Sequence, residues 1–205
     1  MQVSVIDTGT ANIASMLAAL RRHGVDASLT REASVVIAAP FVVLPGVGAF
    51  GAGMSRLEEL DLVSSIATRI REGHATLAVC LGLQMLFDES EESPGVRGMS
   101  IAAGTVRRFP PAVHGARLVV PQLGWNAVVP RGDCELLQPG YAYYANSYHL
   151  TSIPDGWTGA ESEHGVRFVA AIERGAVLGC QFHPELSGAW GHALLGRWLA
   201  KGASC

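Results

Sequence analysis

The sequence predicts a doubly wound α/β fold, in which a mainly parallel sheet gains antiparallel strands in the second half of the chain. Three observations lead to this prediction. Apolar runs alternate with amphipathic helical stretches in the first half. Short strand-like runs separated by Gly, Pro, Asp and Asn fill the second half, and a helical pattern closes the chain. The length of 205 residues suits a single domain spanning 1–205.

The first half alternates strands and helices. The expected strands are Val3–Asp7, Phe41–Leu44 and Thr76–Val79, and the expected helices are Thr10–His23 and Met54–Arg71. Gly24 ends the first helix, and Pro45-Gly46 ends the second strand. The run Ala33–Ala39 fits a helix or a strand, because its periodicity does not decide between them. This alternation implies parallel pairing, with helices on both faces of the sheet.

The second half is expected to add antiparallel strands. These are Thr105–Phe109, Arg117–Val120, Trp125–Val129, Tyr143–Tyr148, Arg167–Glu173 and Val177–Phe182. Ser187–Lys201 carries apolar residues at helical spacing, which predicts the closing helix. The sequence contains no internal repeat, low-complexity tract or linker.

Composition argues against several functional classes. Hydrophobic residues make up 49% of the chain and charged residues 16%, which is enough apolar material for a sizeable core. The net charge is −3 without a run of Lys or Arg, so nucleic-acid binding has no electrostatic basis. Residues 1–8 lack the basic start of a secretion signal, and no stretch approaches the roughly 18 apolar residues of a membrane span. We therefore expect a cytoplasmic protein with no nucleic-acid or membrane partner.

The four cysteines follow no zinc-type or CxxC spacing, so the sequence predicts no metal site. They are Cys80, Cys134, Cys180 and Cys205. A cysteine is by default a small buried hydrophobe or an idle surface thiol. Only Cys80 lies in a motif that suggests chemistry.

Cys80 stands in Ala78-Val79-Cys80-Leu81-Gly82, at the end of an apolar strand and before a helical pattern. A nucleophile on a sharp strand-to-helix turn needs small residues two positions to either side. The helix N-terminus behind it would favour a thiolate and bind an oxyanion. Taken alone, the motif fits a buried core cysteine at a strand end more often than a nucleophile.

A second motif, Gln181-Phe182-His183-Pro184-Glu185, follows a late apolar strand. In an extended segment, positions two apart project to the same side, so His183 and Glu185 can face one another. Pro184 would stiffen that arrangement. A carboxylate that accepts the Nδ1 proton leaves Nε2 free to serve as a base. A solvated His-Pro turn beside an unrelated glutamate fits the motif equally well.

A third motif is the glycine-rich run from Pro45 to Gly53, directly after a strand. Glycines let backbone N–H groups approach a ligand and form an anion-binding concavity. The run lacks the acidic partner of a dinucleotide site and the Gly-Lys-Ser/Thr of a P-loop. An oxyanion loop that faces Cys80 across neighbouring strand ends fits better, and a mobile turn is the alternative.

Together the three motifs resemble the class I glutamine amidotransferases over nearly the whole chain. The resemblance implies the class I glutaminase fold and no metal or organic cofactor. It implies that Cys80 attacks the side-chain amide of glutamine, that His183 acts as base and then acid, and that Glu185 orients His183. Backbone N–H groups of Leu81 and of the Val47-Gly48 loop would stabilise the oxyanion.

Shorter matches resemble one group in this family, the glutaminase subunits of imidazole glycerol phosphate synthase. They are Asp7-Thr8-Gly9, Ala11-Asn12-Ile13, the run from Phe87 to Val96, Gly124-Trp125-Asn126 and Asn146-Ser147-Tyr148. The resemblance implies that Gln84 and Glu92 hold glutamine, with backbone near Ser147 and Tyr148. It also implies a heterodimer with a (β/α)₈ cyclase subunit, which uses the ammonia in histidine biosynthesis. Asn12, Gln122 and Trp125 would face that cyclase.

Four residues depart from the family pattern. Ala78 replaces Gly, Asn146 and Gln122 stand where His is frequent, and Leu186 replaces Lys after His-Pro-Glu. His-Pro-Glu-Leu occurs in the glutaminase of pyridoxal phosphate synthase, so a glutaminase subunit of another synthase is one alternative. A catalytically silent binding protein on the same fold is another. The presence of Cys80, His183 and Glu185 together argues against the silent protein.

Overall fold

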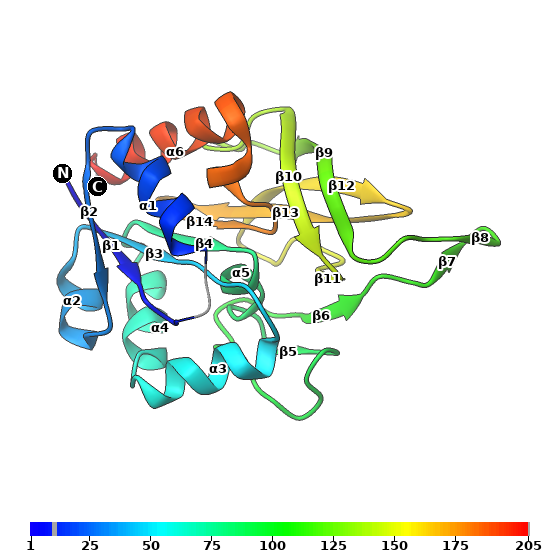
Figure 1. Cartoon of the computed structure of the whole chain (residues 1–205), viewed down its shortest axis with the longest axis horizontal. Helices are drawn as coiled ribbons and strands as arrows, with labels where there is room; N and C mark the ends of the chain where they lie inside the picture. Colours follow the sequence, from blue (N-terminus) through cyan, green and yellow to red (C-terminus); the bar gives the residue numbers. More distant parts are fainter. Residues whose placement is uncertain (10–11, 205) are drawn as a thin grey trace.

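The computed structural model describes residues 1–9 and 12–204, and a nine-stranded sheet forms the centre of this part of the chain (Figure 1). The strand order is β10-β9-β12-β13-β14-β4-β3-β1-β2. The strands are β1 Gln2–Ile6, β2 Asp26–Thr30, β3 Phe41–Leu44, β4 Thr76–Val79, β9 Gln122–Arg131, β10 Gly140–Asn146, β12 Thr158–His164, β13 Val166–Arg174 and β14 Val177–Cys180. Strands β2, β1, β3, β4 and β14 run parallel, and the other four continue the sheet antiparallel. The predicted fold class is confirmed.

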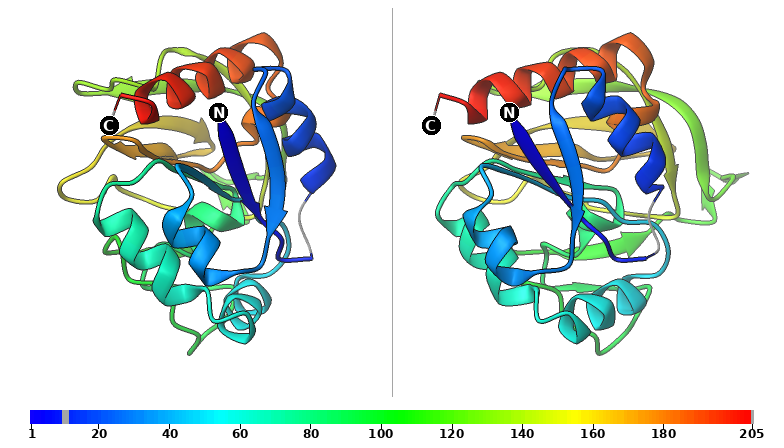
Figure 2. Two further views of the ribbon diagram at one scale, coloured as in Figure 1. Left: turned by 90° about the vertical axis from the view of Figure 1, so that its left-hand side faces the viewer. Right: turned by 60° about the vertical axis from the view of Figure 1, so that its left-hand side comes forward.

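Helices cover both faces of the sheet, as Figure 2 shows. On one face lie α1 (Ile13–Arg21) and α6 (Gly188–Gly202), and on the other lie α2 (Ala33–Ala38), α3 (Phe50–Glu59), α4 (Val63–Arg71) and the short α5 (Leu81–Gln84). Successive strand side chains point to opposite faces. Val5 therefore packs in the cluster of α1 and α6, whereas Ile6 packs in the cluster of α2, α3 and α4. Strands β1, β3, β4 and β14 are buried on both faces, as their apolar sequences require, whereas the edge strand β2 is partly exposed.

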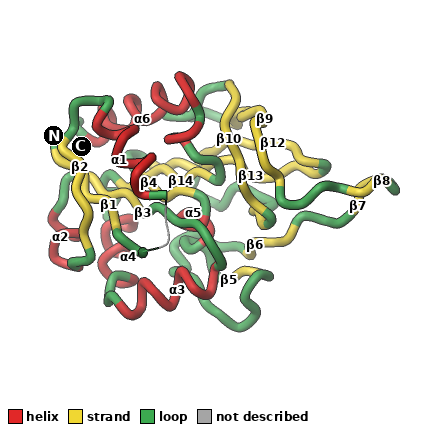
Figure 3. The backbone as a smooth tube through the Cα atoms, viewed as in Figure 1, coloured by secondary structure: helices red, strands yellow, loops and turns green. Residues whose placement is uncertain are grey.

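Two smaller sheets lie beside the main one. Strands β5 (Glu89–Ser90), β6 (Thr105–Arg108) and β11 (Tyr148–His149) form the first. Strands β7 (Ala112–Val113) and β8 (Ala116–Arg117) form a hairpin that projects from the rest of the chain (Figure 3). His114 and Gly115 make its turn with φ of 50° and 80°. A two-residue turn with both φ positive matches the right-handed twist of the hairpin strands.

The single helix predicted for Met54–Arg71 was wrong. The chain forms α3 and α4 instead, and Asp61 between them has a left-handed φ of 54° that interrupts the helical backbone. Helix α3 begins at Phe50, so the second part of the predicted glycine-rich loop is helical. The ambiguous run Ala33–Ala39 is resolved as helix α2. The first predicted helix is described only from Ile13, because Thr10 and Ala11 lie outside the described residues.

The strand predictions also need correction. Strands β2 and β12 were not predicted, because their polar residues obscure the apolar signal. The strand predicted for Arg117–Val120 was wrong, since β8 ends at Arg117. The predicted Tyr143–Tyr148 strand is divided between β10 and β11, and β9 is longer than predicted. Strand β14 ends at Cys180, before the predicted end at Phe182. In the described ranges, no helix is both long and apolar enough to cross a membrane.

Candidate active site

The three sequence motifs meet because three neighbouring parallel strands end at one edge of the sheet. Leu44 at the end of β3 pairs with Ala78 of β4, and Cys180 at the end of β14 pairs with Val79 of β4. The glycine-rich loop, Cys80 and His183 follow these three ends. The carboxyl ends of parallel strands are the usual place for ligand sites in such sheets.

Cys80 occupies a strained turn between β4 and α5. Its φ is 54° and ψ −108°, a backbone conformation rare for non-glycine residues, and its N–H donates to the Cys180 carbonyl at 2.7 Å. A Cβ on Gly82 would lie 2.2 Å from the Leu44 carbonyl oxygen, so this position tolerates only glycine. Ala78 is fully buried on β4, and the site accommodates its methyl group. Close packing therefore requires a small residue at Gly82.

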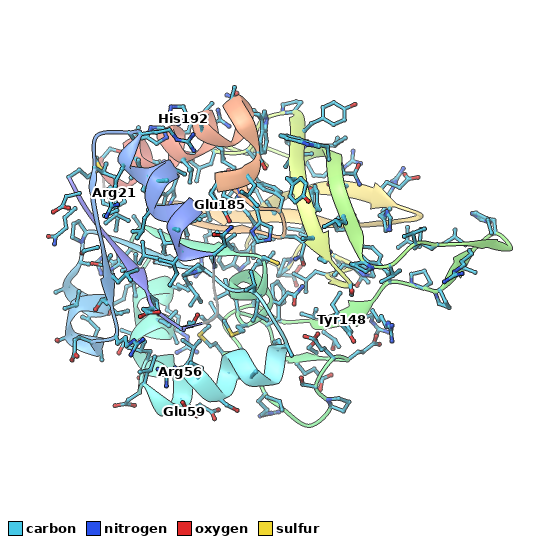
Figure 4. The ribbon with its side chains drawn as sticks, in the orientation of Figure 1. Arg21, Arg56, Glu59, Tyr148, Glu185 and His192 are labelled. Atoms are coloured by element: carbon cyan, nitrogen blue, oxygen red, sulfur yellow. The ribbon has the colours of Figure 1, made fainter. Side chains whose placement is uncertain are left out.

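His183 and Glu185 form the predicted contact. His183 Nδ1 and Glu185 Oε1 are 2.9 Å apart, and the side chains are 7% and 4% exposed. The predicted extended backbone was only half right: His183 is extended, but Pro184–Leu186 forms a 3₁₀ turn, η1. The turn places Glu185 between α1 and the start of α6 (Figure 4). The His183 N–H donates to the Tyr143 carbonyl at 2.9 Å, which anchors the histidine to β10.

The surroundings of His183 favour its protonated form. Burial lowers the pKa of His183, but hydrogen bonds to Cys80 and Glu185 and the negative charge of both outweigh burial and raise this pKa to about 10. At neutral pH the imidazole therefore carries a proton and can serve as a general acid.

The other described cysteines lie in surroundings that keep their thiols protonated. Burial raises the pKa of Cys180 well above its usual value, with the charges of Glu185 and Glu173 adding to the effect. Burial and the charge of Glu173 also raise the pKa of Cys134. Protonated thiols are poor nucleophiles. Cys205 lies outside the described residues.

A cavity of about 380 Å³ opens in front of Cys80. Its wall consists of Val47, Gly48, Cys80, Leu81, Gln84, Glu92, Ala145, Asn146, Ser147, Tyr148 and His183. Every residue predicted for catalysis, oxyanion binding or substrate binding lies in this wall except Glu185, which supports His183 from behind. The structure thus brings together residues from five separate stretches of the chain.

Two wall residues, Ala145 and Asn146, were not predicted as site residues. Asn146 Nδ2 donates to the Tyr148 carbonyl at 2.9 Å, and Asn146 Oδ1 is buried without a hydrogen-bond partner among the described residues. The sequence signal was present, because Asn146 directly precedes Ser147-Tyr148. A buried acceptor without a partner suits a ligand that carries N–H groups.

The glycine-rich loop is held at both ends. The Leu81 N–H donates to the Gly46 carbonyl at 3.3 Å, and the Phe50 N–H donates to Glu92 Oε2 at 2.7 Å. Gly48, between these points, has a φ of 102°, which requires glycine. In this conformation a loop carbonyl therefore occupies the Leu81 N–H that was predicted to bind the oxyanion.

The three residues predicted to face a partner differ in exposure. Asn12 is exposed, and Trp125 is 58% exposed on β9. Gln122 is only 5% exposed, because its side chain belongs to the buried part of β9. That the segments of Asn12, Gln122 and Trp125 face a cyclase stays a prediction.

A cysteine on a strained turn, a protonated histidine and a buried carboxylate define a hydrolase that works through a thioester. Among residues 1–9 and 12–204, no three His, Cys, Asp or Glu side chains are grouped to hold a metal ion. The sequence matches the family "Glutamine amidotransferase class-I" over residues 4–201. The site and the match thus indicate an amidotransferase that draws nitrogen from glutamine.

Similar proteins of known name indicate which kind of amidotransferase subunit this chain is. "Imidazole glycerol phosphate synthase subunit HisH" of Deinococcus radiodurans is 41% identical, with 95% of this chain and 91% of that protein covered. The subunit HisH of Methanothermobacter thermautotrophicus is 40% identical (91% of each chain), and that of Salmonella typhimurium is 37% identical (97% and 99%). The chain therefore belongs to the class I glutamine amidotransferases and, within them, to the HisH subunits of imidazole glycerol phosphate synthase.

Solved structures share the fold. A crystal structure of a glutamine amidotransferase superposes with a TM-score of 0.76 at 19% identity and covers 98% of both chains. The structure of PurLQS from Thermotoga maritima gives a TM-score of 0.68 at 15% identity, with 97% of both chains covered. At these identities the likeness extends to the fold alone.

Proposed function

We propose that this chain is the glutaminase subunit of an imidazole glycerol phosphate synthase, and that it hydrolyses glutamine to glutamate and ammonia for a cyclase subunit in histidine biosynthesis. The observation that carries the proposal is the single cavity that joins Cys80, His183 and the predicted glutamine-binding residues. The similarity to HisH subunits favours imidazole glycerol phosphate synthase as the enzyme to which the subunit belongs. We further propose that the chain works as one cytoplasmic domain, 1–205, without a cofactor.

The reaction follows from the positions of these groups. The Cys80 sulfur attacks the side-chain amide carbon of glutamine, and N–H groups of Leu81 and the Val47-Gly48 loop stabilise the oxyanion. The C–N bond then breaks, and protonated His183 supplies the proton with which ammonia leaves. Neutral His183 next takes a proton from water, which attacks the thioester. Glutamate departs and the Cys80 sulfur is restored.

Glutamine is held by groups that line the same cavity. Gln84 and Glu92 line the cavity together with Cys80, Ser147 and Tyr148. One Glu92 oxygen is already engaged by the N–H at the start of α3. Its second oxygen is available for the positively charged amino group of glutamine. Glu92 would thus fix both the substrate and the end of the oxyanion loop.

The direct test of the function is reconstitution. Glutamate formation should rise when the chain is mixed with the cyclase subunit of imidazole glycerol phosphate synthase, and should not rise with the synthase subunit of pyridoxal phosphate synthase. The loop Pro45-Gly46-Val47-Gly48-Ala49 supports the first partner, because the second glutaminase usually has Pro-Gly-Gly-Glu-Ser there. Stimulation by the pyridoxal phosphate partner alone would reject the proposal.

The glutaminase activity of Glu185→Gln is expected to be roughly tenfold or more higher than that of His183→Ala. Glu185 Oε1 contacts Nδ1 of His183, so its amide replacement leaves the acid in place but lowers the pKa of His183. On the alkaline limb of the pH profile, the activity of Glu185→Gln should therefore decline at a lower pH than that of the wild type. Steady-state assays from pH 6 to 10 on folded variants measure both effects. A greater loss in Glu185→Gln than in His183→Ala would contradict the assignment of roles.

The proposed surface for the cyclase is the exposed face of β9 and β10. Leu123, Trp125 and Tyr141 are 70%, 58% and 64% exposed. Trp125 pairs with Tyr143 and Leu123 with Ala145, so these side chains share one face of the two strands. Gly188 at the start of α6 lies against the Trp125 ring, which places this face beside the turn that carries Glu185. An exposed aromatic cluster of this kind suits a heterodimer interface.

Trp125→Ala should weaken binding of the cyclase by roughly 30-fold or more, because a central aromatic anchor contributes about 2 kcal/mol or more. Isothermal titration of the two subunits measures the loss. Leu29→Ala is the matched control, since Leu29 is an exposed apolar residue (46%) on β2 at the opposite edge of the sheet. An unchanged Kd in Trp125→Ala would remove this residue from the interface.

A further inference from the structure

A buried glutamine, Gln181, touches the proposed nucleophile. Its side chain is 0% exposed, and its Nε2 amide donates to Cys80 Sγ at 3.7 Å. Gln181 follows β14 and precedes His183 by two positions, so the strand that delivers the histidine also delivers this amide. Gln181 has no role in the mechanism proposed for glutamine hydrolysis. A fully buried side-chain amide is costly unless its hydrogen bonds are made, so each of its contacts matters.

The orientation of the Gln181 amide is fixed by a second glutamine. Gln84 Nε2 donates to Gln181 Oε1 at 2.9 Å and to the Tyr148 carbonyl at 3.1 Å. An amide nitrogen carries two hydrogens, so both are committed. Because Gln84 occupies the oxygen of Gln181, it is the nitrogen of Gln181 that faces the sulfur. The backbone N–H of Gln181 donates to the Ala170 carbonyl at 2.8 Å, which fixes the residue on the sheet.

We propose that Gln181 is a positioning residue that stabilises the thiolate form of Cys80, and that Gln84 sets the direction of its amide. A hydrogen bond to an ionised acceptor is stronger than one to a neutral acceptor, and more so in a buried site. The Gln181 N–H therefore favours the thiolate over the thiol. The sulfur receives one donor from His183 and one from Gln181, which hold it in the cavity wall.

The hydrogen-bond chain also connects substrate binding to the nucleophile. Gln84 lines the cavity, and so does Tyr148, whose carbonyl it contacts. A change at Gln84 should therefore alter the reactivity of Cys80 even when no glutamine is bound. The catalytic consequence rests on the proposed glutaminase function, whereas the reactivity of the sulfur can be measured without it.

The test is the rate at which iodoacetamide alkylates Cys80 in the whole chain without glutamine or cyclase, followed by mass spectrometry of the peptide that contains Cys80. Gln181→Met keeps the length of the side chain and removes the donor. Its rate should fall about tenfold at pH 7 and return to the wild-type rate at the alkaline end of the profile. Gln84→Met should shift the pH profile of the alkylation rate in the same direction, but by less than Gln181→Met does. With the cyclase present, Gln181→Met should lower kcat more than it raises KM.

Gln138→Met is the matched control, because Gln138 is exposed and does not line the cavity. A wild-type rate at pH 7 in folded Gln181→Met would overturn the proposal. An equal loss at every pH would overturn it as well, since it would show altered access to the sulfur. If Gln181→Met does not fold, Gln181→Glu has the same size and places an acceptor beside the sulfur, and wild-type alkylation in that variant would be equally decisive. Failure of the glutaminase assay alone would count against the proposed function and would leave this result standing.

Discussion

Replacing Cys80 by alanine is expected to lower glutamine hydrolysis by on the order of 10⁴-fold or more, as for nucleophiles of catalytic triads in general. Cys80 is the described cysteine that lines the cavity in front of His183, and its strained backbone holds the sulfur there. Without the sulfur no thioester forms, and the remaining groups only bind and polarise the amide. Folding should be little affected, because alanine fills most of the space of a small side chain.

The matched control is Cys180→Ala. Cys180 is also buried at the end of a neighbouring parallel strand, but its thiol faces the core cluster and has a raised pKa. We expect near wild-type turnover from this variant once its folding is verified by its Tm. Glutamate release in the presence of liganded cyclase is the measurement for both variants. A comparable loss in Cys180→Ala, or near wild-type activity in Cys80→Ala, would show that the nucleophile has been assigned to the wrong residue.

Adding the cyclase with its nucleotide ligand is expected to raise glutamine hydrolysis by about 10²–10³-fold, the effect of one oxyanion donor. In this structure the Gly46 carbonyl occupies the Leu81 N–H, so an oxyanion would meet an incomplete set of donors. The loop is fixed at Gly46 and Phe50, and Gly48 makes reorientation of the intervening peptides inexpensive. A docked, liganded cyclase would favour the loop conformation that frees the donor.

Steady-state glutaminase assays of the chain alone, with cyclase, and with cyclase plus nucleotide separate docking from activation. Equal rates in all three mixtures would rule out activation of the oxyanion loop by the liganded cyclase. Trp125→Ala should need more cyclase to reach the same maximal rate, because it affects docking rather than the loop. Leu186 stands where the family usually has Lys, so this position forms no ion pair with the partner. Activation should accordingly lack the salt sensitivity that such a pair would add.

The motifs that carry the chemistry were predictable from the sequence because they depend on local covalent and conformational properties. Gly82 must lack a side chain next to the Leu44 carbonyl, and Gly48 must adopt a positive φ. Pro184 keeps His183 extended before η1. The apolar runs of β3 and β4 likewise indicate strands that are buried on both faces. Such signals lie within a few residues of one another, so one sequence is enough to recognise them.

Other features depend on segments that meet only after folding. The polar strands β2 and β12 exist because neighbouring strands pair with them, which their own residues do not reveal. The left-handed backbone at Asp61 between α3 and α4, and the burial of Gln122 in β9, likewise gave no signal in the sequence. Sequence spacing gave Gln181 no role, since its partners Cys80 and Gln84 lie about a hundred positions away.

The sequence by itself determined the class of the fold and located the Cys80 and His183-Pro184-Glu185 motifs, because backbone dihedrals and side-chain reach act over short distances. Taken singly, each motif left a structural alternative open. Only the tertiary structure decided that β14 lies beside β4, and this adjacency creates the rest of the site. It places His183 against Cys80 in a buried setting, where hydrogen bonds and opposite charge together outweigh burial and keep the imidazole protonated. The neighbouring carboxyl ends of β3 and β4 engage the Leu81 N–H with the Gly46 carbonyl. Electrostatic and hydrogen-bond energies depend on distance in space rather than along the chain, so the folded sheet sets them.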